Sequence, residues 1–434
     1  MAAYSYASKS LKRYFKYTNN SGFIKQTKIP SPKDDNNMLK LFKELTPVHV
    51  AEETFMKIVT PINRRERLSI EECSGRVLAE DVIARTNVPH YKRAAMDGYA
   101  LQAEETLGAS RTSPALLNRS ETIGPQTCVR VHTGSPLPDG ADAVIMIEDT
   151  EAVDHDLVEI RAQVHPYENV GEIGEDIQEG EFVFREGHLL RPVDISVLAS
   201  LRLKHVTVHQ KPIVSIIPTG DELIPRNRRE LPEPGEIIET NTLMTELYAK
   251  KWGATTHVSG IILDDPELIR NAIKENLGSD MIILCGGTSV GERDHTPTVI
   301  EEMGRILTRG IKASPGKPTT LAEIKERPVL CMPGYPVAGY VALQLFAKPA
   351  IKKLAHLPQI PENRTKLPLT EKISSRIGYL TFARIKIENN TAKPVMTSGA
   401  SILSSITRSD GYTTIPENTE GYEKGEAVEI ILTE

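Results

Sequence analysis

Acidic side chains recur in the region 211–354, each time directly after a stretch that predicts a β-strand. Glu222 follows one apolar run, and Asp264 follows another. Asp294 closes a glycine-rich segment that begins directly after the apolar run Met281–Cys285. Carboxylates are the ligands that a hard cation such as Mg²⁺ prefers, and two of them facing one anion require a cation between them. The pattern therefore predicts a magnesium-bridged anion, with Glu222 and Asp294 as metal ligands.

Glycines and a lysine accompany these acids. Glycine permits positive φ and close approach of backbone N–H groups to a bound group, and lysine binds oxyanions. A single glycine-rich connection is also a common tight turn without function, so the prediction depends on several clusters lying together. The residues expected to bind substrate are Thr219, Gly220, Gly286, Gly287, Ser289, Gly291, Lys312, Lys317, Pro318, Pro333 and Gly334.

The elements that must position these residues alternate between strand and helix. Continuous apolar runs predict buried strands, and 3.6-residue periodicity predicts helices. The predicted strands are Pro212–Pro218, His257–Leu263, Met281–Cys285 and Val329–Met332. The predicted helices are Asn241–Trp252, Glu267–Leu277, Pro297–Met303 and Val337–Phe346. Such alternation predicts a parallel sheet flanked by helices, in which ligands bind beyond the carboxyl ends of the strands.

The rest of the chain predicts a multidomain α/β plus β protein. Frequent Gly and Pro turns with alternating apolar residues are typical of small β domains. The expected parts are a polar leader (1–44), an elongated helical linking domain (45–88 and 170–210), an inserted β domain (89–169), an α/β domain (211–354) and a C-terminal β domain (355–434).

Two further acidic positions are less distinctive on local grounds. Asp97 precedes Gly98, and Asp-Gly is a common turn, so a turn former is the simpler interpretation there. Glu172, Glu175 and Asp176 lie among glycines, which is equally typical of a solvated acidic loop.

Composition excludes several classes of protein. The 434 residues are 39% hydrophobic and 25% charged, as in globular proteins, and the formal net charge of −6 argues against general nucleic-acid binding. No apolar run approaches the ~18 residues of a membrane-spanning helix. The four cysteines have no metal-binding spacing, and Cys285 and Cys331 fall in apolar strands. Reduced, buried thiols in a cytoplasmic protein are expected.

The leader differs from the remainder. Met1–Lys33 contains no Asp or Glu. It fits a disordered extension, or an upstream start codon with Met38 as the true first residue. A transit peptide is the third interpretation, although transit peptides favour Arg and the leader contains only Arg13.

Taken in order, the motifs of residues 46–434 resemble the molybdopterin molybdenumtransferase (MoeA) family, which includes the E domain of gephyrin. No single motif is specific, but the combination is. The motifs are MDGYAL, HTGSPLPDGADAVIMIED, GEDIQEGE, PTGDELI, ETN, CGGTSVGERD, PGKP, MPGYPVAGY and SGASILSSITRSDGYTTIPENTEGYEKGE.

The resemblance implies four domains, of which the α/β domain is MogA-like and binds the pterin. It also implies a homodimer whose cleft lies between the α/β domain of one subunit and the β domain of the other. The family reaction hydrolyses adenylylated molybdopterin with Mg²⁺ and inserts molybdate or tungstate. The resemblance implies catalytic roles for Asp97, Asp176, Glu222 and Asp294, a cleft position for Thr133, a pterin-side position for Asp264, and oxyanion contacts for Lys317 and Pro318. The molybdopterin adenylyltransferase is a further partner that it suggests.

The sequence departs from the family pattern at three positions near the expected oxyanion. The family commonly has Lys-Pro-Gly-Lys-Pro, and Ser314 stands here in place of the first lysine. It commonly has Pro-Gly-Asn-Pro-Val-Ser, where Tyr335 and Ala338 replace Asn and Ser. A lysine and a hydroxyl are suitable oxyanion donors, so their loss leaves open whether Lys312 contributes and whether the oxyanion is molybdate or tungstate.

Two other functions remain as alternatives. The gephyrin E domain also acts as a dimeric scaffold, but the sequence shows nothing of the upstream domain that gephyrin carries. The adenylyltransferase resembles residues 211–349 alone, and the additional β domains argue against it. Release of AMP from adenylylated molybdopterin separates the three.

Overall fold

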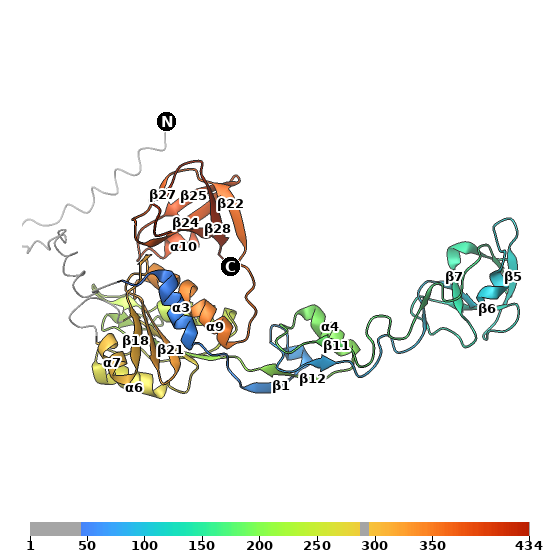
Figure 1. Cartoon of the computed structure of the whole chain (residues 1–434), viewed down its shortest axis with the longest axis horizontal. Coiled ribbons are helices and arrows are strands. Elements are labelled where there is room, and N and C mark those ends of the chain that lie inside the picture. Colours follow the sequence, from blue (N-terminus) through green and yellow to red (C-terminus); the bar gives the residue numbers. More distant parts are fainter. Residues whose placement is uncertain (1–44, 287–294, 434) are drawn as a thin grey trace, which may run out of the picture. The chain divides into compact units, whose positions relative to one another are not determined.

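The computed structural model describes residues 45–286 and 295–433 (Figure 1). Four predicted site residues, Gly287, Ser289, Gly291 and Asp294, lie outside these ranges. Within the described ranges, no helix is long and apolar enough to cross a membrane.

A six-stranded sheet forms the centre of the α/β domain. Its order is β16 (Thr255–Val258), β13 (Ile213–Pro218), β17 (Met281–Cys285), β21 (Arg327–Met332), β20 (Thr320–Ile324) and β18 (Arg305–Arg309). The first four strands are parallel, as predicted. The sheet then continues in two antiparallel strands that the sequence analysis did not predict, because the segment 305–324 reads as turns.

Helices cover both faces of this sheet, which explains why all five residues of β17 are buried. Ile283 packs with one set of helices, and Ile282 and Leu284 pack with the other, since alternate strand residues point to opposite faces. The first set comprises α3 (Val48–Ile58), α5 (Asn241–Lys251), α8 (Pro336–Ala342) and α9 (Lys348–Leu354), and the second comprises α6 (Pro266–Glu275) and α7 (Thr296–Met303).

The first helix differs from its predicted assignment. The sequence analysis placed 45–88 in the linking domain, but α3 packs in the core of the α/β domain. The reason is its apolar face, since Phe55 is fully buried and its ring contacts Phe346 edge-on, with centroids 6.3 Å apart.

The linking domain is built mainly from short antiparallel strand pairs, with α4 (Pro192–Ser200) as its α-helix. Less of it is helical than the sequence analysis predicted. The pairs are β1 (Arg65–Ser69) with β12 (His205–His209), β2 (Val82–Ile83) with β11 (Phe182–Phe184), and β3 (Arg93–Ala94) with β10 (Val170–Gly171).

The inserted region is a small β domain with its own core, as predicted. Its sheet order is β7 (Ala143–Met146), β4 (Gly98–Leu101), β6 (Thr127–Val131), β5 (Ala115–Arg119), β9 (Leu157–Ile160) and β8 (Thr150–Ala152).

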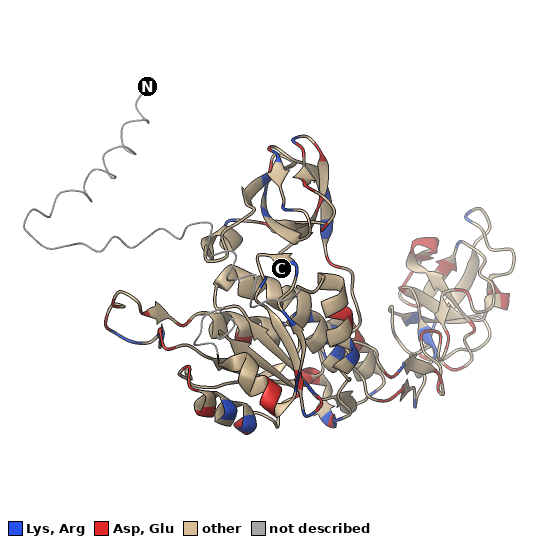
Figure 2. Ribbon diagram, turned by 60° about the vertical axis from the view of Figure 1, so that its left-hand side comes forward, with Lys and Arg blue, Asp and Glu red and all other residues tan. Residues whose placement is uncertain are grey.

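The C-terminal sheet includes one strand from outside its own segment. Its order is β19 (Ala313–Ser314), β24 (Leu380–Glu388), β26 (Gly411–Ile415), β28 (Ala427–Leu432) and β22 (Arg364–Pro368), with β25 (Thr391–Met396) paired to β24. Because β19 immediately precedes the Pro315–Pro318 turn, the C-terminal sheet lies against that turn. Acidic and basic residues are interspersed along the ribbon (Figure 2).

Candidate functional site

The first part of the site lies where the strand order reverses. The chain leaves β13, forms β16 on one side of it and then β17 on the other, so the loops after β13 and β17 diverge at this point. The two loops start side by side before they diverge. At this start, the Thr219 N–H donates to the Cys285 carbonyl at 3.0 Å. A Cβ at Gly286 (φ +108°) would lie 2.3 Å from the Thr219 carbonyl oxygen. Such crevices are the usual ligand sites of α/β sheets.

Three carboxylates gather at this edge. The Asp264 N–H donates to the Asp221 carboxylate at 3.0 Å, and the Glu222 carboxylate lies over Gly220, 2.8 Å from where a Cβ would stand. Burial raises the pKa of Asp264, and the charges of Asp221 and Glu222 raise it further, while His295 opposes them. Among the described residues, negative charge therefore predominates at this edge.

This charge fits a magnesium ion held partly by substrate. Among the described residues, no group of three or more His, Cys, Asp or Glu side chains could hold a metal by itself. Mg²⁺ commonly binds through one or two carboxylates and completes its shell with substrate phosphate and water. Glu222 and Asp264 meet that requirement, whereas the predicted ligand Asp294 lies outside the described residues.

The edge also presents polar groups suited to a ligand. Thr219 is 1% exposed, and its hydroxyl has no hydrogen-bond partner among the residues that the structure describes. The Asn241 side chain donates to the Gly334 carbonyl at 2.7 Å, and Glu239, 6% exposed, accepts from the Thr242 N–H at 2.7 Å. The Asn241 bond holds the start of α5 against the loop after β21, and the Glu239 bond stabilises the first turn of the helix.

The second part of the site is a cavity of about 270 Å³ beside the Pro315–Pro318 turn. It brings together residues from two domains and four separate segments. From the α/β domain, the lining residues are 313–318, Tyr335 and Ala338; from the C-terminal domain, they are Arg376, Tyr379 and Ala400. All three positions that depart from the family pattern line this one cavity. Lys312 does not line it, and its backbone bonds to Thr46 and Leu380.

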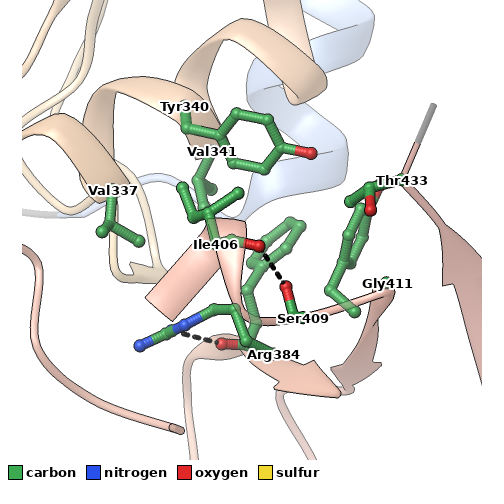
Figure 3. Close-up of a pocket in the computed structure, with 10 residues that line it drawn as sticks. Val337, Tyr340, Val341, Arg384, Ile406, Ser409, Gly411 and Thr433 are labelled. Atoms are coloured by element: carbon green, nitrogen blue, oxygen red, sulfur yellow. Dashed lines mark hydrogen bonds between the residues drawn. The ribbon is translucent and has the colours of Figure 1, made fainter. Parts of the chain in front are cut away.

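The C-terminal segment that contributes Ala400 is held by a buried arginine, Arg384. Figure 3 shows Arg384 in the neighbouring pocket that it lines. Arg384 is 4% exposed and donates to the carbonyls of Phe382, at 2.9 Å, and of Ser398. Burial lowers the pKa of this guanidinium to about 10. Beside it, Val341 of α8 packs against Phe382 and Tyr412, and the Val337 N–H donates to the Ala400 carbonyl at 2.9 Å. These contacts fix one wall of the cavity.

On the inserted domain, the structure brings Asp97 and Thr133 together. The Asp97 carboxylate accepts from the Thr133 N–H at 2.7 Å and from the Thr133 hydroxyl at 3.1 Å. The backbone bond, and then the hydroxyl bond, lower the pKa of Asp97. Asp97 is therefore an anchored, exposed anion directly before β4.

Two of the three acids in the loop after β10 form ion pairs with basic side chains. Glu175 pairs with Arg93 at 2.8 Å and Glu172 pairs with Lys92 at 3.2 Å. The exposed Asp176 lies next to them, and its N–H donates to the Val88 carbonyl at 3.1 Å. Of the three acids, Asp176 is the one whose carboxylate these pairs leave available.

Three family models match consecutive parts of the chain. They are the MoeA N-terminal region (domain I and II) over residues 46–201, the "probable molybdopterin binding domain" over 215–353, and the MoeA C-terminal region (domain IV) over 366–433. The chain belongs to the MoeA family.

Relatives match this MoeA-family chain over most of their length. A "putative molybdopterin biosynthesis protein" of Methanocaldococcus jannaschii is 37% identical over 91% of this chain and 100% of its own. The molybdopterin molybdenumtransferase of Bacillus subtilis is 31% identical over 85% of this chain and 89% of its own. The crystal structure of a molybdopterin biosynthesis MoeA protein from Pyrococcus horikoshii superposes with a TM-score of 0.77, at 31% identity, covering 90% of this chain and 100% of that one.

Sequence reasoning missed several residues of this MoeA-type site. Asp221 lies in the motif PTGDELI and Asn241 in the motif ETN. Their positions in these motifs would have suggested both residues. Asp264 and Asp265 could not be told apart by sequence, but the structure makes Asp265 the N-cap of α6, bonded to two backbone N–H groups. Arg376 carried no signal, because it lies on a different domain from the turn that it faces.

The crowded carboxylates predict a gain in stability when one charge is removed. The pKa of Asp264 is raised in the folded state. As pH rises through that pKa, the carboxyl ionises in an unfavourable environment, and the free energy of unfolding therefore falls. Without divalent cations, Asp264→Asn should therefore raise the thermal midpoint at pH 8 by about 1–2 °C. The gain should disappear near pH 4. Asp265→Asn, which retains a good N-cap, serves as the control and should show no such gain. An unchanged or lower midpoint for Asp264→Asn at pH 8 would contradict the crowding argument.

Proposed function

We propose that this protein is a molybdopterin molybdenumtransferase of molybdenum cofactor biosynthesis. In this proposal it uses Mg²⁺ to hydrolyse adenylylated molybdopterin, inserts molybdate or tungstate, and releases AMP. The names of its curated relatives support the transferase activity. Its own geometry supports the finer assignment of which residues meet which part of the substrate.

The observation that carries the proposal is that one short loop joins the acidic edge to the cationic cavity. Gly334 lies on the edge, where its carbonyl accepts from Asn241 and a Cβ on it would lie 3.9 Å from the Gly286 Cα. The next residue, Tyr335, lines the cavity, as does Ala338. This connection supports the proposal, because a ligand with a phosphate at the edge would lie next to an oxyanion in the cavity, as the transfer requires.

The residues at the edge have complementary roles. Glu222 and Asp264 would hold the cation, whose chemistry is to neutralise charge as the phosphoanhydride breaks. The Thr219 hydroxyl and the backbone around Gly220 and Gly286 bind the pterin side of the substrate. Lys317 binds the oxyanion, because it lines the cavity and its ammonium is a suitable donor to oxygen.

The protein acts as a homodimer in this proposal. Asp97, Thr133 and Asp176 present exposed acidic or polar groups on the inserted and linking domains, and the Asp97 carboxylate lies 3.8 Å from the His132 ring. They would complete the cleft of a second copy, as a two-fold symmetric assembly allows. The molybdopterin adenylyltransferase would supply the adenylylated substrate.

The test is to measure AMP released from adenylylated molybdopterin, with and without molybdate. A transferase releases AMP and forms the metal-containing cofactor only when molybdate is present. A scaffold releases none. An adenylyltransferase instead consumes ATP with free molybdopterin. Absence of AMP release at saturating Mg²⁺ and molybdate would overturn the proposal.

Lys317→Ala should affect the oxyanion more than the pterin. Loss of one charge-assisted hydrogen bond is expected to weaken molybdate or tungstate affinity about tenfold or more. Pterin binding, measured by fluorescence titration, should stay within about twofold, because Lys317 lies in the cavity and not on the acidic edge. Lys325→Ala is a control from the turn between β20 and β21. Equal losses for pterin and oxyanion would contradict the assignment.

A further inference from the structure

Two histidine rings stack where the linking domain contacts the α/β domain. His209 is the last residue of β12, and His356 lies two residues after α9. Their ring centroids are 3.6 Å apart, and the ring planes are inclined by only 13°. The His356 ring donates through Nε2 to the Ile62 carbonyl at 2.7 Å, in the connection between α3 and β1. We call His209, His356 and Ile62 the histidine joint.

Backbone contacts hold both sides of the histidine joint. The Ile62 N–H donates to the Leu354 carbonyl at 3.1 Å, which fixes this connection to the end of α9. The His209 carbonyl accepts from the Arg76 guanidinium at 2.7 Å. Each ring is therefore anchored in its own domain, and the stack joins the two.

The surroundings of His209 favour an uncharged ring. The residue is 6% exposed, and its Nδ1 is buried without a hydrogen-bond partner among the described residues. A proton on Nδ1 would place a buried N–H without an acceptor beside a second imidazole, which costs free energy. Burial, and then the neighbouring His356 and Arg65, lower the pKa of His209, while Glu186 opposes them.

The charged side chains on the elements packed around the two rings are engaged with one another or with the backbone. Arg64 pairs with Asp280, Arg65 with Glu186 and Arg76 with Glu66, and Lys353 donates to the Met56 carbonyl. Among the described residues, no carboxylate forms an ion pair or a hydrogen bond with either imidazole of the joint. An imidazolium in the closed joint therefore has no counter-ion in contact.

We propose that the histidine joint is a pH-sensitive contact, which holds the linking domain to the α/β domain near neutral pH and opens when His209 takes up a proton. Opening exposes the ring to water and removes the cost of a buried N–H without an acceptor. The linking domain carries Asp176 and connects the inserted domain, with Asp97, to the α/β domain, so the joint contributes to how firmly both acids are held. This device depends on no ligand and goes beyond the proposed function.

Proton linkage gives the direction of the effect. The pKa of His209 is lowered in the closed joint, and in the open joint it returns toward the ordinary value of ~6.5. The closed form is therefore fully favoured above that value, and its advantage is lost as pH falls toward the lowered pKa. Coupling of one proton to opening raises the open fraction by up to about tenfold between pH 7.5 and 5.5.

Amide hydrogen–deuterium exchange of the full-length protein, resolved by peptide, measures this opening. The reporters are the amides of Ile62 and Gln210, which donate to the Leu354 and Arg64 carbonyls. Their protection, corrected for the pH dependence of intrinsic exchange, should fall by up to about tenfold between pH 7.5 and 5.5. Strand β26 is the internal reference, because residues 357–434 contain no histidine, and its protection should not change.

His209→Phe retains an aromatic ring for the stack but cannot take up a proton. Its joint amides should be equally protected at both pH values. His205→Phe is the matched control, since His205 is an exposed histidine at the start of the same strand, and this variant should open in acid as the wild type does. Acid opening that persists in His209→Phe, or that is absent from the wild type, overturns the proposal.

A second measurement needs no substitution. Exchange of the histidine C2 hydrogens, followed by mass spectrometry, gives the pH at which each imidazole of the wild-type protein titrates. His209 should titrate below the ordinary value of ~6.5. A midpoint at or above that value overturns the proposal, even if the His209→Phe protein does not fold.

Discussion

Glu222→Gln should reduce AMP release by roughly two or more orders of magnitude, while the protein folds normally and still binds the pterin. That is the scale expected when a key electrostatic contact to a transition state is lost. Its carboxylate lies over Gly220 at the carboxyl end of β13, near Asp221 and Asp264, where the proposed function places a cation that balances the charge. Glutamine keeps the shape and removes the charge. The measurement is AMP release at saturating Mg²⁺, after thermal unfolding has shown a wild-type midpoint.

Glu230→Gln is the matched control, since Glu230 lies in the same connection between β13 and α5, with a side chain 73% exposed. It should release AMP at the wild-type rate. Near-normal release by a stable Glu222→Gln protein would rule out a metal-ligand role for Glu222. The sequence analysis predicts the same loss for Asp294→Asn.

Mixing two inactive variants should restore activity if the cleft is shared between subunits. Asp97→Asn removes the charge of the inserted domain, and Glu222→Gln removes that of the sheet edge. In a random equimolar mixture half of the dimers are mixed, and each mixed dimer has one complete site. About a quarter of wild-type activity is therefore expected, compared with almost none for either variant alone. The measurement is AMP release after subunit exchange.

The control for this experiment is a mixture of Asp97→Asn with Thr133→Ala. Both changes lie on the same hydrogen-bonded pair of the inserted domain, so a mixed dimer contains no complete site. Recovery in this control mixture, or no recovery in the first, would count against a cleft built from two subunits. A fully active monomer in sedimentation would exclude it outright.

Much of the α/β domain could be predicted because the sequence patterns that specify its strands are local. An apolar run such as Met281–Cys285 is buried on both faces wherever it folds, and the structure confirms that strand. The carboxyl ends of parallel strands meet at one edge by geometry alone, so Glu222, Asp264 and Gly286 could be placed together from their positions after strands. The ordered motifs likewise identified the family, since motif order depends on no tertiary contact.

Residue types and periodicity by themselves thus determined the strands and the acidic edge, and the ordered motifs determined the family. Contacts between segments far apart in the chain were decided only by the tertiary structure. Helix α3 joined the α/β core because Phe55 meets Phe346. Arg376 entered the cavity because β19 pairs with β24 across a domain boundary. Each of these outcomes depends on packing and hydrogen bonds between distant residues, and no local pattern in the sequence encodes which distant partner a side chain will meet.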